Sequence, residues 1–235
     1  MFGLGTLINA GAIVVGGLLG MFFGGFLKSP VRDGLTKVCG VSTIFIALSG
    51  ALEKIQVVAG DSAMLIVGCL VLGTLLGELL NIEDAICRFG EWLKRKTGNG
   101  KDDRFVDAFV TASLTVCVGA MAIVGAIEDG VNGDFSVLAT KAVLDLVIIM
   151  PMTASLGKGA IFSAIPVVLL QGSVTVLAGF ARNLMTDGAM NNLSLIGSIL
   201  IFCVGINLLL GKKVRVANML PSVVLAVVAA YLPFG

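Results

Sequence analysis

The chain has 235 residues, of which 57% are apolar and 13% are charged, and its mean hydropathy is +1.04. This composition leaves too little polar surface to cover a water-soluble globule, so we expect a protein surrounded by the lipid bilayer. A formal net charge of +1 gives no reason to expect a nucleic-acid partner. Histidine is absent and the five cysteines lack metal-ligand spacing, so we expect no metal and no cofactor.

The long apolar runs lack the alternation of barrel strands and therefore predict membrane-crossing helices, each of about 20 residues. Eight runs fit, at residues 3–27, 35–52, 62–80, 105–127, 135–156, 159–181, 193–211 and 218–234. The fifth contains Lys141, Asp145 and Pro151, and a hydropathy window can merge it with the sixth. The sequence thus predicts one transmembrane domain over residues 1–235, an all-α bundle of about eight spans, with seven as the alternative.

Basic residues favour eight spans, because Lys and Arg concentrate in short cytoplasmic loops. Eight crossings that leave both termini outside the cytoplasm place 13 of the 16 basic residues inside, and only Lys54, Lys141 and Arg182 outside. Seven crossings would move the basic group at residues 212–215 to the outer side. The first apolar run has no basic residue before it, unlike a cleavable signal peptide, so we expect it to remain and to span.

Residues 82–97 predict an amphipathic helix at the cytoplasmic membrane surface. Apolar residues from Ile82 to Leu93 recur at helical spacing, and the charged residues lie off that stripe. A helix that connects two spans and anchors through Trp92 is the simpler interpretation. A partner-docking or lipid-sensing helix is the functional alternative.

The chain has a weak internal similarity. A shift of 154 residues aligns the first span with the sixth, matching Gly5 with Gly159, and a shift of 157 aligns the second with the seventh, matching Phe45 with Phe202. With eight spans these segments run in opposite directions, which predicts a 3+2+3 inverted repeat of the kind found in transporters. Glycine-rich apolar sequence also aligns with itself readily, so chance similarity is the alternative.

Two series of glycines predict close helix packing. Gly16, Gly20 and Gly24 are spaced by four residues in the first span, and Gly73 and Gly77 have the same spacing in the third. Small residues at this spacing share one helix face and let another backbone approach. Packing is the simpler interpretation and a pore lining is the alternative. The partner helix can belong to the same chain or to a second copy in a homo-oligomer.

Asp145 is the most informative polar residue. It lies ten residues into its span, about 15 Å along a helix and near the middle of a hydrocarbon core of about 30 Å. A carboxylate at this depth is usually functional, but Lys141 lies one turn earlier and can neutralise it in an ion pair. Pro151 and Pro166 should interrupt the fifth and sixth spans. The predicted substrate or ion path comprises Asp145, Lys141, Glu78, Asn9, Gln171, Asn207, Glu128 and Asp129.

Five strings of sequence carry a family resemblance: INAGAIVVGG at 8–17, LGELL at 76–80, VGAMAIVGAIEDG at 118–130, KAVLD at 141–145 and NMLP at 218–221. In combination they make the chain resemble the YqgA/YdfK-like family of uncharacterised bacterial inner-membrane proteins. The resemblance implies a location in the bacterial cytoplasmic membrane and seven or eight spans. It carries over no functional residue.

The sequence contains no catalytic motif and no histidine to serve as a base, so we expect no enzyme. The leading hypothesis is a membrane transporter or channel for a small solute or ion, with Asp145 at its centre and a cavity around residues 151–166. The alternative is a non-transporting membrane scaffold or sensor that acts through helix–helix contacts and the 82–97 helix.

Overall fold

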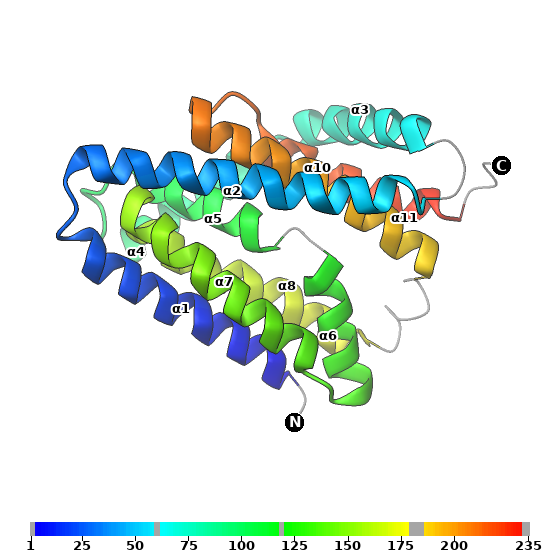
Figure 1. Cartoon of the computed structure of the whole chain (residues 1–235), viewed down its shortest axis with the longest axis horizontal. Coiled ribbons are helices and arrows are strands. Elements are labelled where there is room, and N and C mark those ends of the chain that lie inside the picture. The colour runs from blue at the N-terminus through cyan, green and yellow to red at the C-terminus, as the bar shows by residue number, and fades with distance from the viewer. Residues whose placement is uncertain (1–2, 59–61, 118–119, 179–185, 232–235) are drawn as a thin grey trace. The chain divides into compact units, whose positions relative to one another are not determined.

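The computed structural model describes residues 3–58, 62–117, 120–178 and 186–231, and within these ranges it contains helices and no strand. The α-helices are α1 (Leu4–Gly24), α2 (Ser29–Ile55), α3 (Ser62–Leu80), α4 (Ile82–Lys96), α5 (Phe105–Cys117), α6 (Ala120–Asn132), α7 (Ser136–Leu156), α8 (Ala164–Val176), α10 (Asp187–Leu210) and α11 (Pro221–Ala229) (Figure 1). Two 3₁₀ helices, η1 (Lys158–Ser163) and η2 (Val216–Met219), precede α8 and α11. The predicted all-α class is confirmed.

Six helices within the described ranges are long and apolar enough to cross a membrane: α1, α2, α3, α7, η1 with α8, and α10. The pair α5 and α6, inclined to each other by 62°, makes a seventh, and Val216–Ala229 is a shorter apolar helix at the position of the predicted eighth span. The structure is therefore consistent with about eight spans.

The interruption expected at Pro151 is wrong. Pro151 lies inside α7, which continues to Leu156. The break comes at Gly157, whose φ of +120° is favourable only for glycine, and it is followed by η1. Pro166 lies in the first turn of α8, where a proline removes no helical hydrogen bond. The fifth and sixth spans are thus separate helices.

The chain divides into two compact units, which are described separately. Unit 1 comprises Met1–Cys39, Ile86–Cys117 and Met121–Gly179, and unit 2 comprises Gly40–Ala85, Val118–Ala120 and Phe180–Gly235. Helices α2 and α4 continue from one unit into the other. The single transmembrane domain stays a prediction, as does the cytoplasmic location of α4.

In unit 1, α1 packs along α7 in the same direction (Figure 1). A Cβ added at Gly16 would lie 2.7 Å from the Leu146 carbonyl oxygen, and one added at Gly20 would collide with the Met150 carbonyl oxygen. Gly24 continues the same contact one turn later. The glycine face of α1 therefore receives the backbone of another helix of the same chain.

The rest of unit 1 is arranged around this pair. The end of η1 packs on α1 at Gly17, and α8 then runs antiparallel to α1. Helix α5 packs on η1, where Gly159 lies against the Phe105 carbonyl group. An apolar core joins the four helices and η1; its buried members are Ile13, Ala108, Ala112, Val116, Ile149, Met152, Ala160, Ala164 and Val167.

In unit 2, glycines again mark the contacts between antiparallel helices. Gly73 and Gly77 on α3 lie against the backbone of Ser222 and Asn218. A Cβ added at Gly205 of α10 would lie 3.0 Å from the carbonyl oxygen of Gly40 on α2. Helix α2 thus pairs with α10, and α3 pairs with η2 and α11.

These pairings have the order that an inverted repeat requires. Helices α1, α2 and α3 of the first predicted half pack antiparallel to α8, α10 and α11 of the second half, each pair within its own unit. The helix directions in each unit also agree with the eight-span topology. The repeat stays a prediction, and Arg182, used to count outer charges, lies outside the described residues.

The α1–α7 contact predicts that two alanine substitutions on α1 change the stability of the protein differently. Gly20→Ala should lower the free energy of unfolding by about 1–3 kcal/mol, because the new methyl group overlaps the Met150 carbonyl group. Gly11→Ala is the matched control on the same helix, where an added Cβ meets nothing within 4 Å. It should be neutral or stabilising by up to about 1 kcal/mol, through helix propensity. Thermal unfolding in detergent measures both; equal effects would contradict the contact.

The helix directions also predict which loops share a side of the membrane. In a variant without native cysteines, Gly100→Cys and Lys213→Cys should react with a membrane-impermeant thiol reagent from the cytoplasmic side only. Asp134→Cys, in the turn between α6 and α7, should react from the outer side only. If residues 100 and 213 react from opposite sides, the eight-span topology is wrong.

Candidate functional site

The centre of the candidate site is a buried ion pair on α7. Lys141 Nζ lies 2.6 Å from Asp145 Oδ2, and the two side chains are 9% and 5% exposed. The residues are one helical turn apart and therefore share a face. Asn9 on α1 is fully buried and lies near the Asp145 carboxylate without a hydrogen bond to it. Cys117, at the end of α5, interacts electrostatically with both charges.

Seven buried residues in unit 1 also carry polar side-chain atoms with no hydrogen-bond partner in the described part of the chain, and two of them are Ser113 of α5 and Thr153 of α7. We call the other five, which lie on α1, α6 and α8, the polar row: Thr6, Asn9, Asp129, Gln171 and Thr175. None is more than 4% exposed. A buried polar atom left unpaired costs about 1–3 kcal/mol, so a row of such atoms is unusual in a packed core and typical of a site that binds water, an ion or a solute.

The polar row lies at the end of unit 1 where α1 and α7 begin. Asp129 of α6 accepts a hydrogen bond of 3.0 Å from the backbone N–H of Gly5, the second residue of α1. Gly130, the next residue, lies against the Thr175 carbonyl group. Gln171 lies one turn before Thr175 on α8, which runs antiparallel to α1. The row therefore extends from the first turn of α1 toward the Lys141–Asp145 pair.

The opposite end of unit 1 is mainly apolar, with the buried hydroxyl groups of Ser113 and Thr153 as exceptions. Ile13 follows Asn9 by one turn on α1, and Ile149 follows Asp145 by one turn on α7, so each lies about 6 Å further along its helix. Both belong to the apolar core, with Val116 of α5 and Val167 of α8. The ion pair thus lies at the boundary between a polar half and an apolar half of the unit.

Five of the eight predicted path residues come together in this unit: Asn9, Asp129, Lys141, Asp145 and Gln171. Asp129 has a second, structural role, because its carboxylate caps the first turn of α1, where Gly3 provides no side-chain cap. Glu128 also lies in unit 1, but it is only half-buried and accepts a hydrogen bond from Asn132.

Glu78 and Asn207 lie in unit 2, in a different network. Glu78 accepts a hydrogen bond of 2.7 Å from Arg215. Asn207 holds the loop after α10: its Oδ1 accepts from the backbone N–H groups of Lys213 and Val214, and its Nδ2 donates to the Val214 carbonyl group. Within the described residues, both have structural partners in unit 2, and their place in the path stays a prediction.

Arg215 is the residue that sequence reasoning missed. Besides Glu78, its guanidinium group contacts Asp84 at 3.0 Å and Glu83 at 3.9 Å. Glu83 has a side chain only 4% exposed and pairs with Lys212 at 2.8 Å. We call these five residues the Arg215 cluster. In the sequence, Arg215 is one of the basic residues at positions 212–215, and these residues were used only to assign the topology.

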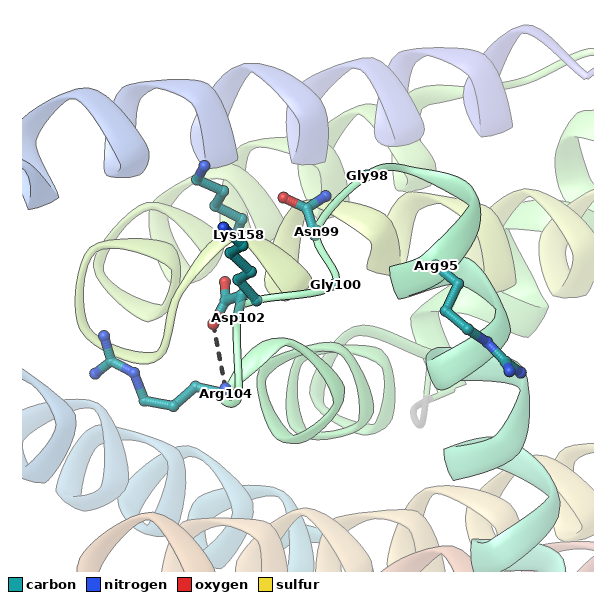
Figure 2. Close-up of a pocket in the computed structure, with 8 residues that line it drawn as sticks. Arg95, Gly98, Asn99, Gly100, Asp102, Arg104 and Lys158 are labelled. Atoms are coloured by element: carbon teal, nitrogen blue, oxygen red, sulfur yellow. Dashed lines mark hydrogen bonds between the residues drawn. The ribbon is translucent and has the colours of Figure 1, made fainter.

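A separate hollow of about 780 Å³ lies at the end of unit 1 where α4 ends and α5 and η1 begin (Figure 2). Basic residues dominate its lining, which consists of Arg95, Gly98, Asn99, Gly100, Lys101, Asp102, Arg104 and Lys158. Among the residues that the structure describes, no group of three or more His, Cys, Asp or Glu residues is placed to hold a metal ion.

Apolar spanning helices around buried charged and amide groups define a polytopic helical membrane protein. Residues 4–231 match the family described as "Protein of unknown function (DUF554)", and the chain belongs to that family. It is 25% identical over 229 residues to "Uncharacterized membrane protein YdfK" of Bacillus subtilis, covering 97% of this chain and 95% of the relative. It is 27% identical over 227 residues to "Uncharacterized protein YqgA" of Escherichia coli, covering 95% and 94%. No solved structure matches the chain. The predicted family is confirmed.

The Arg215 cluster predicts a stabilising role for one member of a basic loop. Arg215→Ala should lower the free energy of unfolding by about 1–3 kcal/mol, because it leaves Glu78 and the nearly buried Glu83 with fewer hydrogen-bonded charges. Lys213→Ala, two residues away and exposed, should change it by less than about 0.5 kcal/mol. Chemical unfolding in detergent measures the stability of both variants. If Arg215→Ala is as stable as Lys213→Ala, Arg215 does not have the stabilising role assigned to it.

Proposed function

We propose that unit 1 forms the route of a transporter or channel for a small cation or polar solute in the bacterial inner membrane. The observation that supports it most is the buried Lys141–Asp145 pair, which lies at the end of the polar row farthest from the first turn of α1. Charged residues inside spanning helices are costly and mark ion or substrate pathways by default. The ion pair alone explains how the charges are tolerated, but it does not explain the unpaired amides of Asn9 and Gln171.

The chemistry of the polar row favours a cation or a hydrogen-bonding solute over an anion. Its unpaired atoms include the oxygens of Thr6, Asn9, Asp129, Gln171 and Thr175. Carboxylate, amide and hydroxyl oxygens are ligands of hard cations. They also accept hydrogen bonds from water, which can carry a proton. The amide nitrogens of Asn9 and Gln171 could hydrogen-bond a neutral solute.

Lys141 competes with an arriving cation for the Asp145 carboxylate. Its ammonium group already occupies the Asp145 carboxylate, so an arriving cation must displace it, and a proton that neutralises Asp145 releases it. Either event changes the charge beside Asn9 and Cys117 and frees the Lys141 side chain, which is long enough to move toward the end of α7. Binding at Asp145 is thereby coupled to a movement of Lys141.

The apolar core supplies the barrier that a transporter needs. With the polar row reaching Asp145 from the end where α1 begins, the residues around Ile13 and Ile149 close the other half of unit 1. In the predicted topology the polar half faces outside. In this proposal the structure is a closed state. Polar side chains lead to Asp145 from the outer side, and the apolar core separates Asp145 from the other side.

Flux measurements test the proposal. Because Asp145→Asn alone leaves Lys141 as an unpaired buried charge, which is strongly destabilising, the decisive variant is the neutral double change Lys141→Gln with Asp145→Asn. In proteoliposomes it should lower the flux of the transported species at least about tenfold, the loss expected when an interaction of about 1.4 kcal/mol is removed. The matched control is Asp103→Asn, a fully exposed carboxylate in a loop.

The flux panel includes protons, alkali cations and small organic ions. If the folded double variant transports every probe as the wild type does, or if the wild type gives no flux above empty liposomes, the proposal is wrong. Protein folding is checked by gel filtration in detergent, so that loss of flux through misfolding is recognised.

A non-transporting scaffold or sensor is the second candidate, and the surface of α4 favours it. Trp92 is 49% exposed beside Phe89, which is also exposed, and the last turn of the helix carries Lys94, Arg95 and Lys96. This candidate expects charge reversal at the three basic residues to abolish binding of a partner, while the double change at Lys141 and Asp145 has no effect.

A further inference from the structure

The hollow at the end of unit 1 is independent of the proposed transport route. It is formed by the last turn of α4, the loop over residues 97–104, the start of α5 and the first residue of η1. The hollow thus lies at a loop and at the ends of helices, away from the middle of the apolar spans. Figure 2 shows Arg95 on one side of the loop and Arg104 on the other.

The loop backbone is held in one shape by hydrogen bonds. Helix α4 ends in a Schellman motif, in which the N–H of Asn99 donates to Lys94 and that of Gly98 donates to Arg95. Gly98 has a φ of +72°, as the motif requires. Asp102 donates its N–H to the Asn99 carbonyl group and accepts the N–H of Arg104 on its side chain at 3.1 Å. The loop therefore presents its side chains from a defined backbone.

The charge of the hollow is unbalanced. Arg95, Lys101, Arg104 and Lys158 line it with Asp102 as the only acid among the lining residues, a formal charge of +3. Asp102 already accepts a backbone hydrogen bond, and within the described residues no carboxylate lies within 4.0 Å of the four cations. The Arg215 cluster, by contrast, balances its two cations with three carboxylates.

Space for a ligand is also present. A Cβ added at Gly98 or Gly100 would meet nothing within 4 Å, so the turn itself leaves the hollow open. The volume of about 780 Å³ lies within the range of about 300–1,000 Å³ that is usual for small-molecule sites. It exceeds the space that one phosphate group needs. The four cations come from three separate segments, and Figure 2 shows the side chains of Arg95 and Arg104 extending away from each other on opposite sides of the loop.

We infer that this hollow binds a phosphate-bearing anion through Arg95, Lys101, Arg104 and Lys158. Guanidinium and ammonium groups are the usual ligands of phosphate oxygens, and arginine binds them in a bidentate manner. Because the hollow lies at the helix ends of a membrane protein, the head group of an anionic phospholipid is the first source of that phosphate. A soluble phosphate compound has the same chemistry and is the second source.

Native mass spectrometry of the full chain in detergent tests the inference, with cardiolipin, phosphatidylcholine and pyrophosphate as probes. The test variant is Lys101→Ala with Lys158→Ala, two exposed residues that line the hollow. The matched control is Lys96→Ala with Lys213→Ala, which removes the same charge from exposed residues outside it. The variant Lys101→Arg with Lys158→Arg restores the charge.

The wild type should bind cardiolipin saturably and phosphatidylcholine not. Affinity should fall about 10-fold to 30-fold in the alanine test variant, stay within about twofold in the control, and return with arginine. Displacement of cardiolipin by pyrophosphate, or binding of pyrophosphate alone, assigns the hollow to a soluble phosphate compound. If no probe binds saturably, or if the test and control variants lose affinity equally, the hollow is not a phosphate site and its charges serve only general attraction to the membrane.

Discussion

The structure of unit 1 depends on the close approach of α1 and α7. In lipid, the removal of apolar surface from water does not drive helices together, so contact must come from packing and polar groups. The glycine face of α1 provides that contact, since the carbonyl groups of Leu146 and Met150 lie where side chains would otherwise be. Two parallel helices have the same rise per residue, so this contact sets the register of the pair and places Asn9 at the level of the first half of α7.

That register makes the ion pair tolerable. A Lys–Asp pair removed from water pays a large desolvation cost, which is recovered only with good geometry and further hydrogen-bonding groups. Asn9 supplies a polar neighbour to Asp145 from the facing helix. Lys141, at 2.6 Å, supplies the opposite charge from the same face of α7. Unit 2 uses the same principle for another purpose: Gly77 lets the backbone at Asn218 approach α3, and the Asn218 side chain then accepts the N–H of Glu83 at 2.7 Å.

What the sequence could predict here was local. Apolar length predicted the spans, and a separation of four residues predicted the Lys141–Asp145 pair, because both patterns depend only on helix geometry. Proline was less informative, since helices packed against neighbours tolerate it, and α7 continues through Pro151 to a break at Gly157.

Contacts between distant segments had no such pattern. The cap that Asp129 provides to α1 joins residues 124 positions apart, and the contact of Arg215 with Glu78 joins residues 137 positions apart. Glu78 and Asn207 were predicted as path residues because they are polar residues in or near apolar runs, and no sequence pattern indicates the partners that they have in unit 2.

The predicted inverted repeat matches unlike side chains at equivalent backbone positions in unit 1. A shift of 154 residues relates α1 to α8, and it matches Asn9 with Ser163 and Gln171 with Gly17. Ser163 is buried, but its hydroxyl group donates to the Ala160 carbonyl group, and Gly17 has no side chain. The unpaired amides therefore occur at one end of the helix pair, while the symmetry-related end contains a satisfied hydroxyl group, a glycine and the apolar core. The proposed route therefore has two unlike ends, and it expects the two sides of the membrane to reach Asp145 by different movements of the helices.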